Sequence, residues 1–144
     1  MTVRLDHFIG GTWSAPAGGE YFASTNPATL EVLYEAARGS EEDVRRAVAA
    51  ASNAFQSPLW RDLTATKRGH LLRRLGDLIG EHAEELAELE TLDNGKLLRE
   101  MRGQLANLPE YLYYYAGLAD KVQGSQIPTN SLTMLNYTQR EPLG

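Results

Sequence analysis

The feature that most constrains the fold of this chain is a pair of apolar stripes at helical spacing. After Thr64 the first stripe comprises Leu71, Leu72, Leu75, Leu78 and Ile79. The second stripe lies in the segment Lys96–Val122, at Leu105, Leu108, Leu112, Tyr115, Ala119 and Val122. Spacings of three and four residues place each set on one face of an α-helix, and such a face needs apolar surface to cover. We expect the two faces either to pack on each other or to stay partly exposed.

Composition narrows the class of protein. The chain has 144 residues, of which 42% are hydrophobic and 23% are charged, as in an ordinary globular domain. The net charge of −5 disfavours nucleic acid as a partner. The absence of cysteine excludes disulfides, thiolate metal sites and a cysteine nucleophile within this chain. Residues 1–7 are charged too early for a signal peptide, and the longest apolar run is too short for a bilayer, so we expect a soluble, cytoplasmic protein with no membrane partner.

Turn residues predict short strands in the first part of the chain. Gly10-Gly11 accepts the positive φ of a two-residue hairpin, and Asn26-Pro27 opens a second turn. Tyr21–Thr25 and the segment 30–37 are predicted to be extended.

Helices are predicted to follow. Ser40 and Thr64 have the residue types that cap helix N-termini. Pro109 predicts a kink or a restart in the long helix after Lys96, because proline removes a helical hydrogen bond. At the end of the chain, alternation from Leu132 to Leu143 predicts one long strand, for which no partner follows.

The segment Glu88–Lys96 is the most informative stretch for function. It closes an amphipathic helix on Asp93 and then breaks the helix at Asn94-Gly95. The carbonyl groups at a helix C-terminus carry partial negative charge, so a carboxylate there needs a cation or hydrogen-bond donors nearby. One reading is that Asp93 caps the Asn94-Gly95 turn. The other is that it binds a monovalent cation together with backbone carbonyl groups, because hard cations prefer oxygen ligands.

Other patterns favour structural roles. The three histidines, His7, His70 and His82, lack the spacing of metal ligands, and the acids between Glu81 and Glu90 are typical of a solvated helix face. The four tyrosines between Tyr111 and Tyr115 are typical of a packing face, because the surrounding charge is not the basic charge of a nucleic-acid site. The glycine pairs lack a phosphate-loop pattern.

Seven segments follow one another in a recognisable order: Phe8–Trp13, Thr25–Thr29 with Glu31-Val32, Glu42–Phe55, Trp60–Leu75, the Asp93 segment, Tyr114–Lys121 and Tyr137–Gly144. In these segments and their order the sequence resembles the N-terminal portion of the NAD(P)-dependent aldehyde dehydrogenase superfamily. One departure is Leu30, which stands where the family usually has glycine. Leucine disfavours a positive φ, so we expect this turn to differ in type.

The resemblance implies an α/β fold and a division of the chain. Residues 1–123 would form the N-terminal part of the cofactor-binding domain, with β-hairpins and amphipathic helices that cover a Rossmann-like cofactor domain. Residues 124–144 would form an oligomerisation arm, whose strand Leu132–Leu143 would join subunits into a homodimer or homotetramer. By position, Thr25, Asp93 and Ser24 would hold a sodium or potassium ion.

The resemblance also implies that the whole enzyme oxidises a small-molecule aldehyde to a carboxylate with NAD or NADP, through a cysteine thiohemiacetal. The family's catalytic cysteine, glutamate and asparagine, and the residues that hold the dinucleotide, match no position here, so we expect this chain alone to be inactive. The alternative is a self-contained, non-catalytic interaction module derived from the same front end, which would bind a partner by strand addition. The sequence leaves the aldehyde and the choice between NAD and NADP open.

Overall fold

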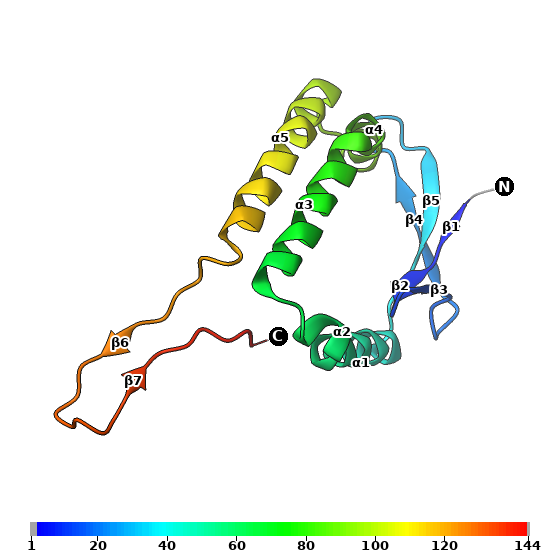
Figure 1. Cartoon of the computed structure of the whole chain (residues 1–144). Coiled ribbons are helices and arrows are strands. Elements are labelled where there is room, and N and C mark those ends of the chain that lie inside the picture. Colours follow the sequence, from blue (N-terminus) through cyan, green and yellow to red (C-terminus); the bar gives the residue numbers. More distant parts are fainter. Residues whose placement is uncertain (1–2, 144) are drawn as a thin grey trace.

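The first forty residues form short strands, as the turn residues predict. The computed structural model describes residues 3–143 (Figure 1). The strands are β1 (Arg4–Leu5), β2 (His7–Ile9), β3 (Thr12–Ser14), β4 (Tyr21–Thr25) and β5 (Val32–Ala37). In one sheet, β5 lies in the middle and pairs antiparallel with β4 and parallel with β1. β2 and β3 form a separate antiparallel hairpin.

Left-handed residues form the two tight turns. Gly10 and Gly11 have φ angles of 62° and 83°, which confirms the predicted two-residue hairpin. At the second turn, Leu30 has a φ of 62° although leucine disfavours this region. Its amide donates to the carbonyl of Asn26 at 2.8 Å, and the amide of Asn26 donates to the carbonyl of Glu31 at 2.9 Å. These bonds stabilise the left-handed conformation of Leu30. We expected the leucine to avoid a positive φ, and it does not.

The rest of residues 40–118 is mostly helical. The helices are α1 (Glu41–Gln56), α2 (Pro58–Arg61), α3 (Ala65–Glu81), α4 (Ala83–Asn94) and α5 (Leu98–Leu118). Ser40 and Thr64 cap α1 and α3 as predicted. The predicted restart at Pro109 is wrong, because α5 continues through it. Pro109 is buried, and its ring lies against Gly80 of α3, so packing offsets the lost hydrogen bond.

Asp43 fastens the first helix to the strand region. Its buried carboxylate accepts hydrogen bonds from the Ser40 hydroxyl at 2.7 Å and from the backbone amide of Ala17 at 3.0 Å, and it also pairs with Arg46. These donors, with the Ser40 hydroxyl the largest contributor, hold the pKa of Asp43 far below its usual value. One buried acid therefore caps α1 and ties the loop before β4 to it.

The helices α3 and α5 lie side by side and approach closely at two glycines (Figure 1). A Cβ atom on Gly69 would lie 2.6 Å from the backbone oxygen of Ala116, and one on Gly76 would lie 2.7 Å from the Tyr113 ring. Where α4 also packs on α5, Ala87 and Met101 are the fully buried apolar residues of the described chain. The two glycines of α3 therefore let the backbone and the Tyr113 ring of α5 approach closely.

The apolar stripe of α3 is partly exposed, with Leu72 and Ile79 half-buried and the other three leucines open. Leu71, Leu75 and Leu78 keep 53%, 47% and 38% of their surface accessible, because the glycine side of α3 is the side that packs on α5. Val44 and Val48 of α1 are exposed as well. Within residues 3–143 no helix is both long enough and apolar enough to cross a membrane.

The end of the chain forms a hairpin and not the predicted lone strand. β6 (Gln126–Ile127) pairs antiparallel with β7 (Asn136–Tyr137), and the hairpin extends away from α5 in Figure 1. The long strand Leu132–Leu143 is thus wrong in length, because residues 128–135 turn back and bring β7 onto β6. A Cβ atom on Gly124 would overlap the carbonyl of Thr138, so the backbones meet there.

Two alanine substitutions test the contact between α3 and α5. We expect Gly69→Ala to lower the free energy of unfolding by about 1–3 kcal/mol, because the new methyl group meets the backbone oxygen of Ala116. The control is Gly103→Ala in α5, where a Cβ atom meets nothing within 4 Å. That change should raise the free energy of unfolding by about 0.5–1 kcal/mol through helix propensity. Urea unfolding followed by circular dichroism measures both, and equal stability of the two variants would contradict this packing.

Candidate functional site

Asp93 lies where the end of α4 meets the strand pair β4–β5. Ser24 of β4 and Tyr34 of β5 stand opposite each other in the strand register, so their side chains share one face of the sheet. Asp93 lies in the last turn of α4, which ends on Gly95 in the left-handed conformation, with a φ of 77°. Three elements distant in sequence thus bring these side chains to one place.

Both hydroxyl groups donate to the same carboxylate oxygen. Tyr34 Oη lies 2.6 Å from Asp93 Oδ1, and Ser24 Oγ lies 2.7 Å from it. The Tyr34 and Ser24 hydroxyls lower the pKa of Asp93, because they stabilise its charged form. In turn, the bond to Asp93 raises the pKa of Tyr34. The helix-ending acid thus has the hydrogen-bond donors that its position at a helix C-terminus requires.

Gly95 brings the turn after β4 against the helix end. A Cβ atom on Gly95 would lie 2.8 Å from Cγ of Pro27. A side chain at position 95 would therefore push the turn away, in addition to the strain of its positive φ. The side chain that accepts a hydrogen bond from the amide of Lys96 is that of Asn94, so Asn94 caps the turn that one reading had assigned to Asp93.

The structure brings two of the three predicted site residues together directly. Ser24 is bonded to Asp93, while Thr25 is the next residue of β4, beyond a shift in the strand register. Sequence reasoning missed Tyr34, which contributes the shorter of the two bonds. The signal that could have found it is the register of the hairpin around Asn26-Pro27, which sets Tyr34 opposite Ser24.

The oxygen atoms of this cluster suit a hard monovalent cation better than a transition metal. Asp93 Oδ2 receives no hydrogen bond from residues 3–143, and the side-chain oxygens that contact Oδ1 are the hydroxyls of Ser24 and Tyr34. Across the same described residues, no group of three or more His, Cys, Asp or Glu side chains is placed to hold a metal ion. Oxygen ligands with a single carboxylate are typical of weakly bound hard cations.

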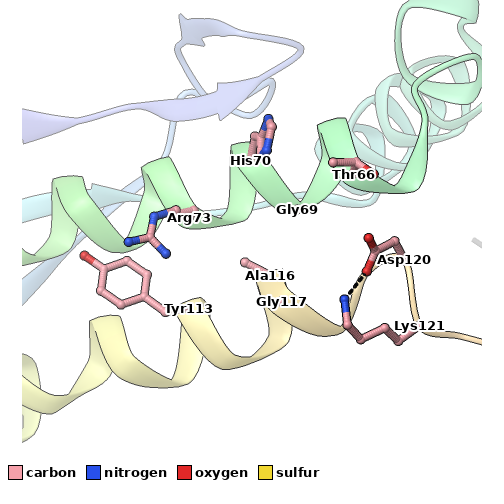
Figure 2. A pocket seen from close by; sticks show the side chains of 9 residues that line it. All are labelled: Thr66, Gly69, His70, Arg73, Tyr113, Ala116, Gly117, Asp120 and Lys121. Carbon is pink, nitrogen blue, oxygen red and sulfur yellow. Dashed lines mark hydrogen bonds and ion pairs between the residues drawn. The ribbon is translucent and has the colours of Figure 1, made fainter.

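A separate pocket of about 270 Å³ lies between α3 and α5 (Figure 2). Arg73 extends toward the ring of Tyr113, and its guanidinium carbon lies 4.7 Å from the ring centroid. Asp120 and Lys121 pair with each other at the far end, while His70 points away from α5. None of the predicted site residues lines this pocket, and its charged groups are already paired or point outward.

A profile of the aldehyde dehydrogenase family matches residues 13–144. The chain is 46% identical over 127 residues to (Z)-2-((N-methylformamido)methylene)-5-hydroxybutyrolactone dehydrogenase of Acinetobacter baylyi, covering 88% of this chain and 26% of that protein. It is 45% identical over 140 residues to retinaldehyde dehydrogenase 3 of Rattus norvegicus, covering 95% of this chain and 27% of that protein.

Solved structures agree with these matches. An NAD+ complex of aldehyde dehydrogenase from Bacillus cereus superposes with a TM-score of 0.91 at 42% identity, covering 97% of this chain and 28% of that one. Betaine aldehyde dehydrogenase from Staphylococcus aureus, also in complex with NAD+, superposes with a TM-score of 0.83 at 38% identity. The match covers 89% of this chain and 26% of that one. The chain belongs to the aldehyde dehydrogenase family, and it spans little more than a quarter of the length of these relatives.

The donors around Asp93 can be tested by removing one of them. We expect Tyr34→Phe to raise the pKa of Asp93 toward its ordinary value, because the carboxylate loses its shorter hydrogen bond. Tyr21→Phe is the control, since Tyr21 donates to Asp6 instead. NMR titration of the Asp93 carboxyl carbon measures the shift.

The lowered pKa of Asp93 determines how the stability of the folded chain changes with pH. Asp93 stabilises the folded chain above the pKa of an unfolded aspartate, about 3.9, and this contribution is lost as the pH falls through the lower folded value. The Tyr34→Phe chain should therefore lose less stability on acidification than the unchanged chain. An unchanged Asp93 titration in this variant would contradict the assigned bond.

Proposed function

We propose that this chain serves as the N-terminal portion of an oxidoreductase that oxidises an aldehyde to a carboxylate with NAD or NADP, through a cysteine thiohemiacetal. Membership of the family supports this, and so do the NAD+ complexes of the similar Bacillus cereus and Staphylococcus aureus enzymes. The chain has no cysteine, so the nucleophile must come from other polypeptide. We also propose a cytoplasmic location, with which the lack of cysteine is compatible.

The observation that carries this proposal is the exposed apolar surface of the helices. Leu71, Leu75 and Leu78 of α3 keep 53%, 47% and 38% of their surface accessible among residues 3–143. A surface of this kind on a folded domain marks a site that other protein covers. We propose that it covers the Rossmann-like cofactor domain, and that residues 1–123 belong to that domain.

The hairpin β6–β7 is proposed as the arm that joins subunits, with residues 124–144 as its extent. Leu132, Leu135 and Tyr137 are exposed on it. A short hairpin is marginally stable alone, and its open edges can pair with a further strand. A homodimer or homotetramer is the assembly that we propose.

The Asp93 cluster is proposed as part of a site for a sodium or potassium ion. Ser24 and Asp93 would supply side-chain oxygens, and Thr25 would supply its backbone carbonyl. Oδ2 of Asp93, which accepts no hydrogen bond from residues 3–143, supports this choice.

Activity is the direct test of the proposed function. We expect no NADH or NADPH formation from the purified 144-residue chain with simple aldehydes, because it lacks the nucleophile. The protein as its own cells make it, purified by an N-terminal affinity tag, should oxidise aldehydes. Turnover by the 144-residue chain alone would contradict the proposal. A native protein of this length without turnover would favour the non-catalytic interaction module.

The cation site has its own test. We expect the unchanged chain to broaden the ²³Na NMR line, and Asp93→Asn to abolish the broadening, because the only carboxylate of the proposed site is lost. Asp120→Asn is the control, since Asp120 is an exposed acid at the end of α5 that pairs with Lys121. Equal broadening by the two variants would contradict a site at Asp93.

A further inference from the structure

The outward side of α5 carries a hollow lined by Glu110, Tyr111, Tyr114 and Tyr115, with a volume of about 320 Å³. The three tyrosines keep 65%, 65% and 59% of their surface accessible. The rings of Tyr114 and Tyr115 meet edge to face, with centroids 5.3 Å apart and an interplanar angle of 86°. The predicted packing face of tyrosines is therefore open among residues 3–143, and its rings present both faces and edges.

The helical period separates these residues from the inner side of α5. Spacings of three and four residues place all four on one face. Tyr113 lies on the other side, where its hydroxyl donates to Asp77 at 2.8 Å and Arg73 lies 4.7 Å from its ring centroid. The inner tyrosine thus has a cation over its ring, whereas no arginine or lysine among residues 3–143 occupies that place for the three outer tyrosines.

The charge of the hollow favours a cation. Glu110 makes no ion pair with any of residues 3–143, so its carboxylate is uncompensated beside the rings. The face of an aromatic ring is negative as well, because of its quadrupole. With a net charge of −5 on the whole chain, an anionic ligand such as a phosphate or a nucleotide is repelled from this place.

We propose that this hollow binds a quaternary ammonium group. Such a cation has no hydrogen to donate, so it needs ring faces and a nearby negative charge, which the lining supplies. A guanidinium or a primary ammonium ion would also donate hydrogen bonds to the Glu110 carboxylate and the tyrosine hydroxyls, whereas a quaternary ammonium group depends on the ring faces and the charge alone. The volume lies at the lower end of small-molecule pockets, roughly 300–1,000 Å³, which fits a small ligand better than a polymer.

A pair of isosteric probes separates charge from apolar contact. Choline and 3,3-dimethyl-1-butanol have the same shape, but only choline is charged. In ligand-observed saturation-transfer NMR with the 144-residue chain, we expect transfer to the methyl groups of choline and much weaker transfer to those of the alcohol. Equal transfer to both would show an apolar docking face and would overturn the proposal, as would the absence of transfer to choline.

Variants locate the site on α5. We expect Tyr114→Leu and Glu110→Gln each to weaken choline binding roughly two- to five-fold, the loss typical of one exposed cation contact. Tyr137→Leu is the control, because Tyr137 is an exposed tyrosine of the hairpin β6–β7. Glu110→Gln keeps the size of an exposed side chain, so it tests the charge even if Tyr114→Leu disturbs the fold. Unchanged binding by Glu110→Gln would overturn the proposal, and the binding readout does not depend on aldehyde oxidation.

Discussion

The close contact between α3 and α5 determines which faces of the helical layer are buried and which are exposed. Gly69 and Gly76 let the two helices approach until backbone and ring atoms touch, which fixes the side of α3 that is buried. Because the glycine side is used in this contact, Leu71, Leu75 and Leu78 of α3 stay exposed among residues 3–143. The layer therefore has one face held by close helix packing and another that offers apolar surface to further protein.

A second contact, between the end of α4 and the strands, depends on charge. The carboxylate of Asp93 is unfavourable beside the partial negative charge of a helix C-terminus unless donors compensate it. The hydroxyls of Ser24 and Tyr34 do so from two strands, and Pro27 packs on Gly95 beside them. Local electrostatics thus join the helical layer to the strands at one well-defined point.

Local signals predicted the local features. The hairpin at Gly10-Gly11 and the caps at Ser40 and Thr64 follow from the residues at those positions. Periodicity marked the leucine face of α3 but could not show which side packs within the chain, because that choice belongs to the partner helix. Tyr34 was missed because its place beside Asp93 depends on strand register, and the pairing of β6 with β7 depends on how residues 128–135 turn.

The most direct test of the uncovered helical face is the solution behaviour of the 144-residue chain. Sedimentation velocity over a range of concentrations, with calorimetric unfolding of the same samples, measures whether the leucine stripe of α3 is left open. An open stripe predicts concentration-dependent association and a broad, weakly cooperative unfolding transition. A strictly monomeric chain with one sharp transition would contradict it, because the apolar faces would then be sealed within the molecule.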